Sequence, residues 1–162
     1  MTTQVPAPFE TGLQEIHPDW IDYNNHLNMA YYNVLFDKGA DDVWDWIGFG
    51  PHYIAATNCT TFAAEFHIRY LRELKLGDRV RGAFYVVDHD EKRFHHFMEL
   101  RHEDGWLAAT GEGMTLHVNL GGPKVVAMPE PILSRVAALH AAHAELPPLE
   151  GIGASIGIRR RR

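Results

Sequence analysis

One long helical segment constrains the fold of this chain more than any other feature. From residue 28 onward, apolar side chains recur at helical spacing. They are Met29, Tyr32, Leu35, Phe36, Val43 and Ile47. Asn28 is a favourable N-cap, and Gly48, Gly50 and Pro51 follow the last apolar position. The pattern predicts a helix of about 18 residues with one face to bury, and Gly39 within it is expected to pack closely against a sheet.

The segment after this helix alternates apolar and polar residues, as a half-buried strand does. Over residues 60–73 the alternation puts the following side chains on one face: Phe62, Ala64, Phe66, Ile68 and Tyr70. Glu65 is then expected to share the other face with Ala63, His67 and Arg69. Three further strand-like segments follow, divided by the turn-forming clusters "DHDEK" and "EDG".

The remaining segments complete an α+β pattern. Residues 9–17 are compatible with an edge strand before the long helix, and residues 130–146 have the spacing of a second, amphipathic helix. The order strand, helix, four strands, helix predicts an antiparallel sheet wrapped around the long central helix. We expect a single domain over residues 1–146 and a flexible tail over 147–162, where "PPLEGIGASIG" precedes four arginines.

Composition excludes several classes of function. The chain has 15 Lys and Arg against 21 Asp and Glu, a formal charge of −6, which disfavours a nucleic-acid partner. The single Cys59 excludes an intramolecular disulfide and fits a reducing compartment. Neither a leader peptide nor a membrane-spanning apolar run is evident, so a cytoplasmic protein without a membrane partner is predicted. The 11 histidines form no closed ligand set, and no metal site is predicted.

The stretch "DYNNHLNMAYYNVLFD", residues 22–37, places an acid, amides and an imidazole at the start of the long helix. Aspartate and asparagine commonly shape turns and cap helices, so a structural role for Asp22 stays open. The start of a helix also offers unpaired N–H donors and a dipole that favours negative charge. The same residues therefore suit either a capped turn or a site for an anionic transition state.

Three segments, together with the element order, resemble the hotdog-fold acyl-CoA thioesterases. They are "WIDYNNHLNMAYYNVLFD", "HIRYLRELKLGD" and "DHDEKRFHHF", and they are most similar to the branch that contains the betainyl-CoA thioesterases of carnitine breakdown. The resemblance implies a hotdog fold and hydrolysis of a small acyl-CoA, with betainyl-CoA as a candidate, to the free acid and CoA. It implies no cofactor apart from the coenzyme A of the substrate. Relatives usually pair edge to edge, which implies a homodimer or a dimer of dimers.

The resemblance also assigns catalytic candidates. Asp22 matches the aspartate that acts as nucleophile or general base in the family, and His26 or Asn28 would add a hydrogen-bond donor. Most relatives have glycine directly before the histidine, where this chain has Asn25. Asparagine tolerates positive φ better than other non-glycine residues, so the turn is expected to survive.

Substrate-binding candidates follow from the chemistry of the expected substrate. A trimethylammonium group requires a carboxylate, for which Glu65 is a candidate, or aromatic faces, for which the candidates are Tyr31, Trp44, Trp46 and Trp106. The phosphates of coenzyme A require cations, for which Arg69 and Arg93 are candidates, with Arg72 and Lys92 nearby. The structural alternatives are a solvent-facing or arginine-paired glutamate, core aromatics and solvated cations.

Two other functions remain open at this point. Hotdog enoyl-CoA hydratases carry a related motif, which "DYNNH" echoes, but the proline of that motif is absent and His26 comes one residue early. A non-catalytic acyl-CoA-binding module is the second alternative, because a fold alone does not determine function.

Overall fold

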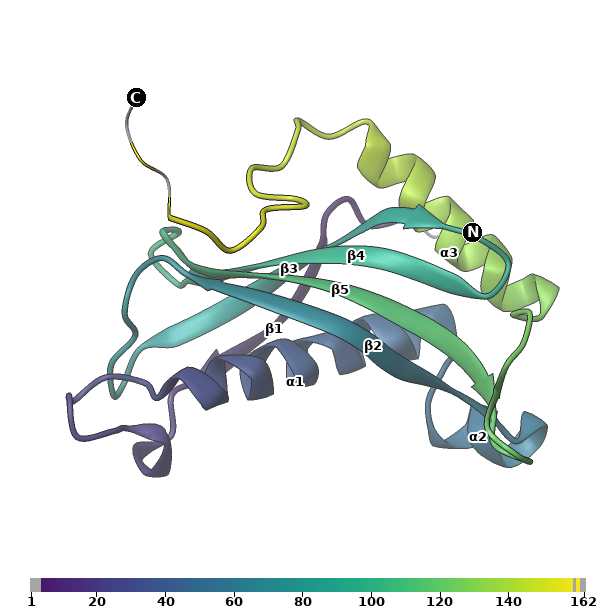
Figure 1. Ribbon diagram of the computed structural model, residues 1–162, viewed down its shortest axis with the longest axis horizontal. Coiled ribbons are helices and arrows are strands. Elements are labelled where there is room, and N and C mark those ends of the chain that lie inside the picture. The colour runs from purple at the N-terminus through teal and green to yellow at the C-terminus, as the bar shows by residue number, and fades with distance from the viewer. Residues whose placement is uncertain (1–3, 159, 161–162) are drawn as a thin grey trace.

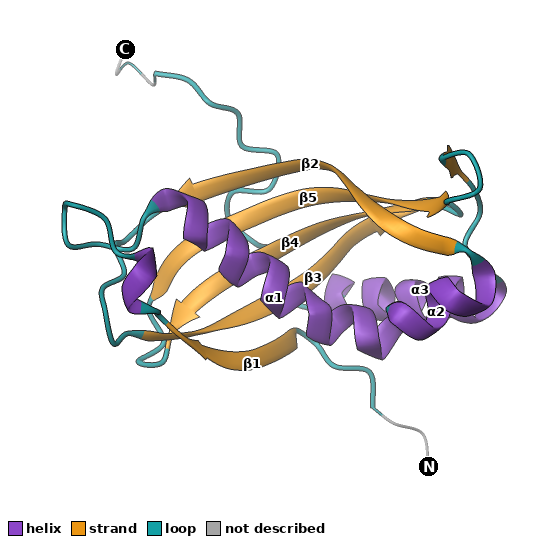
Figure 2. Cartoon of the chain, turned by 90° about the horizontal axis from the view of Figure 1, so that it is seen from below, coloured by secondary structure: helices purple, strands orange, loops and turns teal. Residues whose placement is uncertain are grey.

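The computed structural model describes residues 4–158 and 160, and it consists of a curled antiparallel sheet over a long helix (Figures 1 and 2). Its elements are β1 (Phe9–Glu15), the 3₁₀ turn η1 (Pro18–Trp20), α1 (Met29–Ile47), α2 (Pro51–Thr57), β2 (Cys59–Tyr70), β3 (Arg79–His89), β4 (Arg93–His102), β5 (Leu107–Asn119), β6 (Lys124–Val125) and α3 (Glu130–Ala144). The strand order is β1-β3-β4-β5-β2, every neighbour is antiparallel, and β6 pairs with β5. The predicted α+β architecture is confirmed.

The central helix α1 has the predicted bounds. The Asn28 side chain accepts a hydrogen bond from the Ala30 N–H at 3.0 Å, and Gly48 ends the helix in the left-handed conformation. Arg135 of α3 donates to the Ile47 carbonyl at 2.9 Å. The sheet covers the apolar face of α1. None of the described helices is long and apolar enough to cross a membrane.

Glycines allow the sheet and the helix to approach closely. A Cβ at Gly39 of α1 would lie 3.3 Å from the Thr11 hydroxyl of β1, which confirms the expected close packing. Gly113 of β5 makes room for two aromatic rings on the face that α1 covers. A Cβ there would lie 2.6 Å from His96 Cε1 and 2.9 Å from Phe66 Cδ2, which is closer than real Cβ atoms approach.

The segment between α1 and β2 contains a short helix that the sequence pattern did not predict. Pro51, expected only to stop α1, occupies the first turn of α2. A proline at this position sacrifices no helical hydrogen bond, because the first N–H groups of a helix have no intrahelical partner. The short helix was missed because a proline that closes one helix can also begin the next.

The predicted faces of β2 are wrong on one side of a β-bulge. The register against β5 shifts between Ala63 and Glu65, so the alternation reverses there. Phe66 packs against the core beside α1, whereas Phe62 is 44% exposed on the opposite face. Ala63 likewise leaves the face of Glu65. A strictly alternating pattern cannot locate a bulge, because one extra residue inverts every position beyond it.

Helix α3 covers the part of the β3 edge that β1 leaves free. The pairing of β1 with β3 ends at Phe84. Beyond it, the Val86 N–H donates to His143 Nδ1 at 2.9 Å, and His143 Nε2 donates to the Pro6 carbonyl at 3.0 Å. These bonds require a neutral imidazole with its proton on Nε2, and burial lowers the pKa of His143.

The chain after α3 crosses the face of the sheet opposite α1, which we call the outer face (Figure 1). Leu146 and Leu149 pack against Ala83, Tyr85 and Phe97. Farther along, the Gly153 N–H donates to the two carboxylate oxygens of Glu112 at 3.0 and 2.9 Å.

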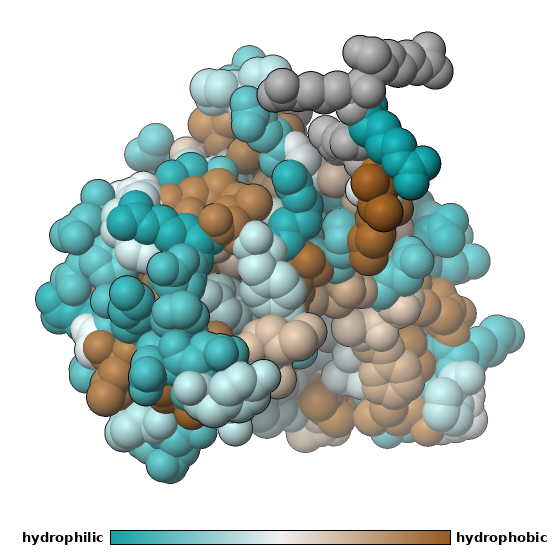
Figure 3. Space-filling model, turned by 60° about the vertical axis from the view of Figure 1, so that its left-hand side comes forward, coloured by the Kyte–Doolittle hydropathy of each residue, from teal (hydrophilic) through white to brown (hydrophobic). Residues whose placement is uncertain are grey.

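The end of the described tail contrasts with this docked part. The last isoleucines, Ile156 and Ile158, are 91% and 86% exposed, and Figure 3 shows brown side chains projecting beside the grey residues. Three of the four terminal arginines lie outside the described residues. The predicted flexibility of residues 147–162 stays a prediction, now for a segment with defined contacts up to Gly153.

We expect Gly113→Ala to lower the free energy of unfolding by about 1–3 kcal/mol, because the new methyl group displaces the His96 and Phe66 rings. Urea unfolding measures this change. Gly157→Ala is the matched control, since a Cβ there meets no atom within 4 Å. Equal stability of the two variants would contradict the packing described.

We also expect stability to fall on acidification. Burial lowers the pKa of His143, and it lowers the pKa of His96 to about 3. Below a pH of roughly 6.5 the unfolded chain binds protons at these residues while the folded chain does not, so the free energy of unfolding decreases as the pH falls.

In urea unfolding series between pH 7.5 and 5, His143→Gln should reduce this dependence by at most about 1.4 kcal/mol per pH unit. The exposed His52 supplies the control substitution, His52→Gln, which should leave the dependence unchanged. If the His143→Gln variant kept the pH dependence of the native protein, the assignment of a neutral His143 imidazole in the folded chain would be refuted.

Candidate active site

The turn before α1 fixes the Asp22 carboxylate. The Asp22 N–H donates to the His26 carbonyl and the Asn25 N–H donates to the Asp22 carbonyl, both at 3.0 Å. Asp22 Oδ1 accepts from the Asn24 N–H at 2.8 Å, which leaves Oδ2 without a partner among residues 4–158 and 160. Asn25 has a φ of 60°, so the asparagine takes the left-handed conformation that the sequence predicted it would tolerate.

Three hydrogen bonds tie this turn to α1 and to the link between β2 and β3. The Leu27 N–H donates to the Leu74 carbonyl at 2.7 Å, and the Asn28 N–H donates to the Trp20 carbonyl at 2.9 Å. The Leu74 N–H in turn donates to the Tyr32 hydroxyl of α1 at 3.1 Å. Because Leu27, Tyr32 and Leu74 are buried, the position of Asp22 relative to the helix is set by the core.

Asp22 faces a cavity of about 360 Å³ beside the start of α1. Its lining comes from the turn, from α1 and from the end of β2: Asp22, His26, Leu27, Met29, Tyr32, Tyr70, Leu71, Arg72 and Glu73. The Tyr70 hydroxyl donates to the Met29 carbonyl at 3.2 Å, and the Tyr70 and Tyr32 rings meet edge to face at 5.1 Å. The cavity therefore combines acidic groups with an aromatic wall.

Two carboxylates, Asp22 and Glu73, line this cavity together with His26 and Arg72. The pKa of Glu73 is lowered, first by a hydrogen bond from its own backbone N–H and further by the nearby His26 and Arg72. Glu73 is therefore anionic at neutral pH. Two carboxylates in one cavity favour a ligand with a cationic group.

Met29, the first residue of α1, lines the cavity and has a backbone N–H without a partner in the described chain. The Ala30 N–H is taken by the Asn28 cap, whereas the N–H of Met29, the first helical residue, finds no acceptor within the described chain. Such an amide, together with the helix dipole, stabilises a developing oxyanion. Met29 was absent from the sequence candidates because a backbone N–H gives no signal in residue type.

The structure brings together some of the predicted catalytic residues. Asp22 and His26 both line the cavity, and Asn28 lies next to them as the helix cap. Tyr31 lies outside the lining and stacks on Trp20, with ring centroids 5.4 Å apart. Trp44 lies in the core, where its Nε1 donates to the Thr61 hydroxyl at 2.7 Å, so the structure gives it a packing role.

The other substrate-binding candidates lie away from Asp22. Glu65 lines a separate cavity of about 560 Å³ on the outer face, under the C-terminal tail. Arg69 lies close to Gly151 of that tail, and Arg93 pairs with Asp90 at 2.6 Å in the turn between β3 and β4. This outer cavity is larger, but no helix start lines it, so we place the candidate site at Asp22.

Sequence reasoning missed Tyr70 and Glu73 as lining residues and gave Arg72 only as one of several cations. Their common signal is position: they end β2 and follow it directly, in the segment "HIRYLRELKLGD". Within the described chain, no group of three or more histidine, cysteine, aspartate or glutamate side chains is arranged to hold a metal ion.

Comparison with known proteins identifies relatives over nearly the full chain. A family model described as the thioesterase-like superfamily matches residues 16–136. A betainyl-CoA thioesterase from Pseudomonas aeruginosa is 36% identical over 157 residues, which span 96% of this chain and 97% of that protein. An L-carnitine dehydrogenase/betainyl-CoA thioesterase from Rhizobium meliloti is 31% identical over 147 residues, which span 90% of this chain but 29% of that longer protein.

Solved structures with the same architecture extend these findings. A hypothetical protein from Staphylococcus aureus, determined in complex with CoA, matches with a TM-score of 0.87 and 30% identity, covering 97% of this chain and all of that one. A DHNA-CoA thioesterase from the same organism matches with a TM-score of 0.72 over 82% of this chain and 93% of its own, and at 17% identity it shows the fold alone.

The conformation of Asn25 generates a stability prediction. Asn25→Gly should change the free energy of unfolding by less than about 1 kcal/mol, whereas Asn25→Val should lower it by about 1–2 kcal/mol, because a β-branched residue is strained at positive φ. Urea unfolding of both variants tests this. Asn24→Val, at a neighbouring exposed position without positive φ, is the control, and a harmless Asn25→Val would exclude the described turn.

Proposed function

This chain belongs to the thioesterase-like superfamily and is a thioester hydrolase of the hotdog fold, and we propose that Asp22 drives its hydrolysis of a small cationic acyl-CoA such as betainyl-CoA. The predicted family, fold and enzyme class are thereby confirmed. The observation that carries the proposal is the meeting of a partly free carboxylate and a free helix-start amide in one cavity.

These two groups match the two needs of thioester hydrolysis. An oxygen nucleophile adds to the carbonyl carbon, negative charge develops on the carbonyl oxygen, and the C–S bond then breaks to release the CoA thiolate. The Asp22 carboxylate either takes a proton from the attacking water or attacks directly, forming an anhydride that water hydrolyses. The Met29 N–H and the α1 dipole stabilise the oxyanion, and His26 adds a donor at the same cavity.

The lining of the cavity supports a cationic acyl group. Trimethylammonium groups bind to aromatic faces and nearby carboxylates, and here the Tyr70 ring and the Glu73 and Asp22 carboxylates line the same space. These side chains take the roles that the sequence assigned to Trp44 and Glu65. The similarity to a betainyl-CoA thioesterase over nearly its whole length supports the same substrate.

Strand β2 supports a homodimer or a dimer of dimers. It is a 12-residue strand at the edge of the sheet, and no described strand pairs with its free side. The unpaired N–H and C=O groups of a long edge strand can pair with another chain. A two-fold arrangement of identical chains would provide such a partner for both copies. We propose that two copies pair along β2 and that the enzyme works in the cytoplasm, where the free Cys59 stays reduced.

The test is thiol release from betainyl-CoA, straight-chain acyl-CoAs and an aroyl-CoA by native protein and by Asp22→Asn. We expect betainyl-CoA to be hydrolysed fastest and Asp22→Asn to lower kcat by roughly 10²–10⁴, since the amide cannot act as base or nucleophile. Asp37→Asn, at an exposed position of α1, is the control and should retain full activity.

Each alternative function predicts a different experimental result. Loss of crotonyl-CoA absorbance without thiol release would identify a hydratase. Tight acyl-CoA binding without turnover, unchanged by Asp22→Asn, would identify a binding module. A folded Asp22→Asn variant with the native rate would remove Asp22 from the mechanism.

A further inference from the structure

Arg72, at the rim of the Asp22 cavity, is held differently from the arginines of β3 and β4. Those arginines pair with carboxylates: Arg79 with Glu103, Arg81 with Glu10, Arg93 with Asp90 and Arg101 with Glu99. Arg72 instead lies over the Trp106 indole, with Cζ 4.0 Å from the ring centroid. Across the described residues, no carboxylate comes within ion-pair distance of Arg72.

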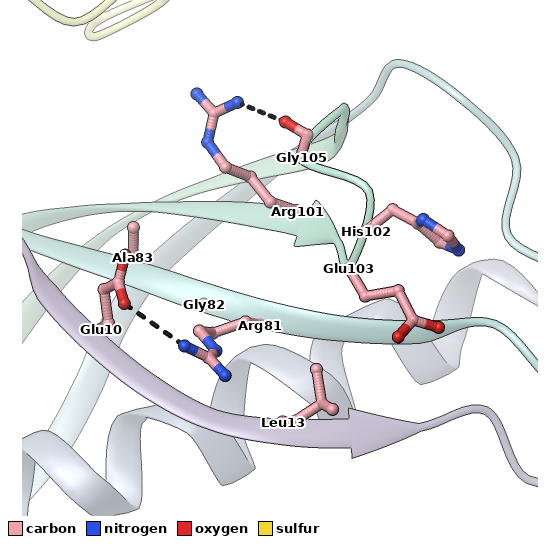
Figure 4. A pocket seen from close by; sticks show the side chains of 9 residues that line it. All are labelled: Glu10, Leu13, Arg81, Gly82, Ala83, Arg101, His102, Glu103 and Gly105. Carbon is pink, nitrogen blue, oxygen red and sulfur yellow. Dashed lines mark hydrogen bonds and ion pairs between the residues drawn. The ribbon is translucent and has the colours of Figure 1, made fainter.

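A third cavity shows the contrast directly. It measures about 380 Å³ and lies on the outer side of β1, β3 and β4 (Figure 4). Its arginines are occupied: Arg81 points to the Glu10 carboxylate at 3.3 Å and Arg101 donates to the Gly105 carbonyl at 3.1 Å. An anion entering there would compete with these existing partners, whereas an anion at Arg72 would not.

The Trp106 ring is itself supported from behind. The His102 imidazole stacks on the indole with ring centroids 4.5 Å apart and planes 9° apart. The Arg72 guanidinium and the His102 imidazole both lie too close to the indole centre to share one face of the ring. Guanidinium, indole and imidazole therefore form a three-layer stack. His102 Nδ1 accepts from the Asp104 N–H at 3.1 Å, which holds the imidazole within the turn between β4 and β5.

The backbone of Arg72 is fixed as well. The N–H groups of Leu71 and Arg72 both donate to the Ala108 carbonyl, at 2.9 and 3.0 Å, where β2 ends. Both ends of the Arg72 side chain are therefore positioned before a ligand arrives, which reduces the conformational entropy lost on binding. Stacking uses the face of the guanidinium and leaves its N–H edge free for two parallel hydrogen bonds to an oxyanion.

We propose that Arg72, stacked on Trp106, binds a phosphate group of the coenzyme A part of the substrate, and that His102 positions the indole. The proposal rests on the proposed acyl-CoA thioesterase function and assigns separate roles to the carboxylates and the arginine of its cavity. Glu73 and Asp22 face the cationic acyl group, and Arg72 holds the anionic carrier. Arg72 thus takes the role that the sequence assigned to Arg69 and Arg93, which lie outside this cavity.

The experiment compares Arg72→Ala with native protein on one acyl group carried by CoA, by dephospho-CoA and by pantetheine. With acyl-CoA we expect KM to rise roughly tenfold or more, with kcat nearly unchanged, because charge-assisted hydrogen bonds to phosphate are lost. With acyl-pantetheine, which lacks phosphates, the variant should match the native protein. If Arg72→Ala still raises KM with the dephospho-CoA thioester, the contact is to the diphosphate. If KM is then equal to that of the native protein, the contact is to the 3′-phosphate.

Matched variants separate this role from general damage. Arg81→Ala removes a paired arginine of the third cavity and should leave KM for acyl-CoA unchanged. Trp106→Phe keeps an aromatic face and should have a KM near that of the native protein, whereas Trp106→Leu should raise KM for acyl-CoA but not for acyl-pantetheine. Thermal melting of each variant confirms folding.

Calorimetric titration with CoA alone tests the same contact without turnover, and Arg72→Ala should weaken this binding roughly tenfold or more. Equal KM values for native and Arg72→Ala on acyl-CoA, or an equal defect on acyl-pantetheine, would overturn the proposal while leaving the thioesterase function intact. Failure of native protein to hydrolyse any of the thioesters would instead refute the proposed function, and the CoA titration would still decide the role of Arg72.

Discussion

Burial of one face of α1 is the constraint on which the rest of the structure depends. The side chains on this face lie under a sheet that curls because its strands are twisted and interrupted by bulges. Close packing leaves little freedom in how helix and sheet meet, as the contacts at Gly39 and Gly113 show. The two ends of α1 are therefore fixed in space, one by Asn28 and the other by Arg135.

The candidate site uses the open end of this buried helix. Its N–H groups point out of the core beside a turn that Tyr32 and Leu74 tie to the helix, so carboxylate and amide donor keep a constant relation. The link after β2 then adds groups of opposite charge, Glu73 and Arg72, to the same cavity. A substrate with a cationic acyl group and an anionic carrier fits this division of charge.

The sequence predicted the parts of this arrangement that follow from local pattern. Helical spacing and capping residues gave α1, and the turn before it gave Asp22 and His26. The faces of β2 could not be read correctly across the bulge at residues 63–65, because one unpaired residue inverts the alternation. Trp44 and Glu65 have suitable side chains, but only the tertiary structure shows that one is in the core and the other on the outer face. The stacking of Arg72 on Trp106 joins two segments distant in sequence, and no local pattern encodes such a contact.

The central claim is that the thioester lies between Asp22 and the start of α1. A crystal structure of Asp22→Asn with an intact acyl-CoA tests it most directly. The account predicts the carbonyl oxygen within hydrogen-bond distance of the Met29 N–H and the carbonyl carbon facing residue 22. A thioester bound in the outer-face cavity beside Glu65, away from the helix start, would contradict it.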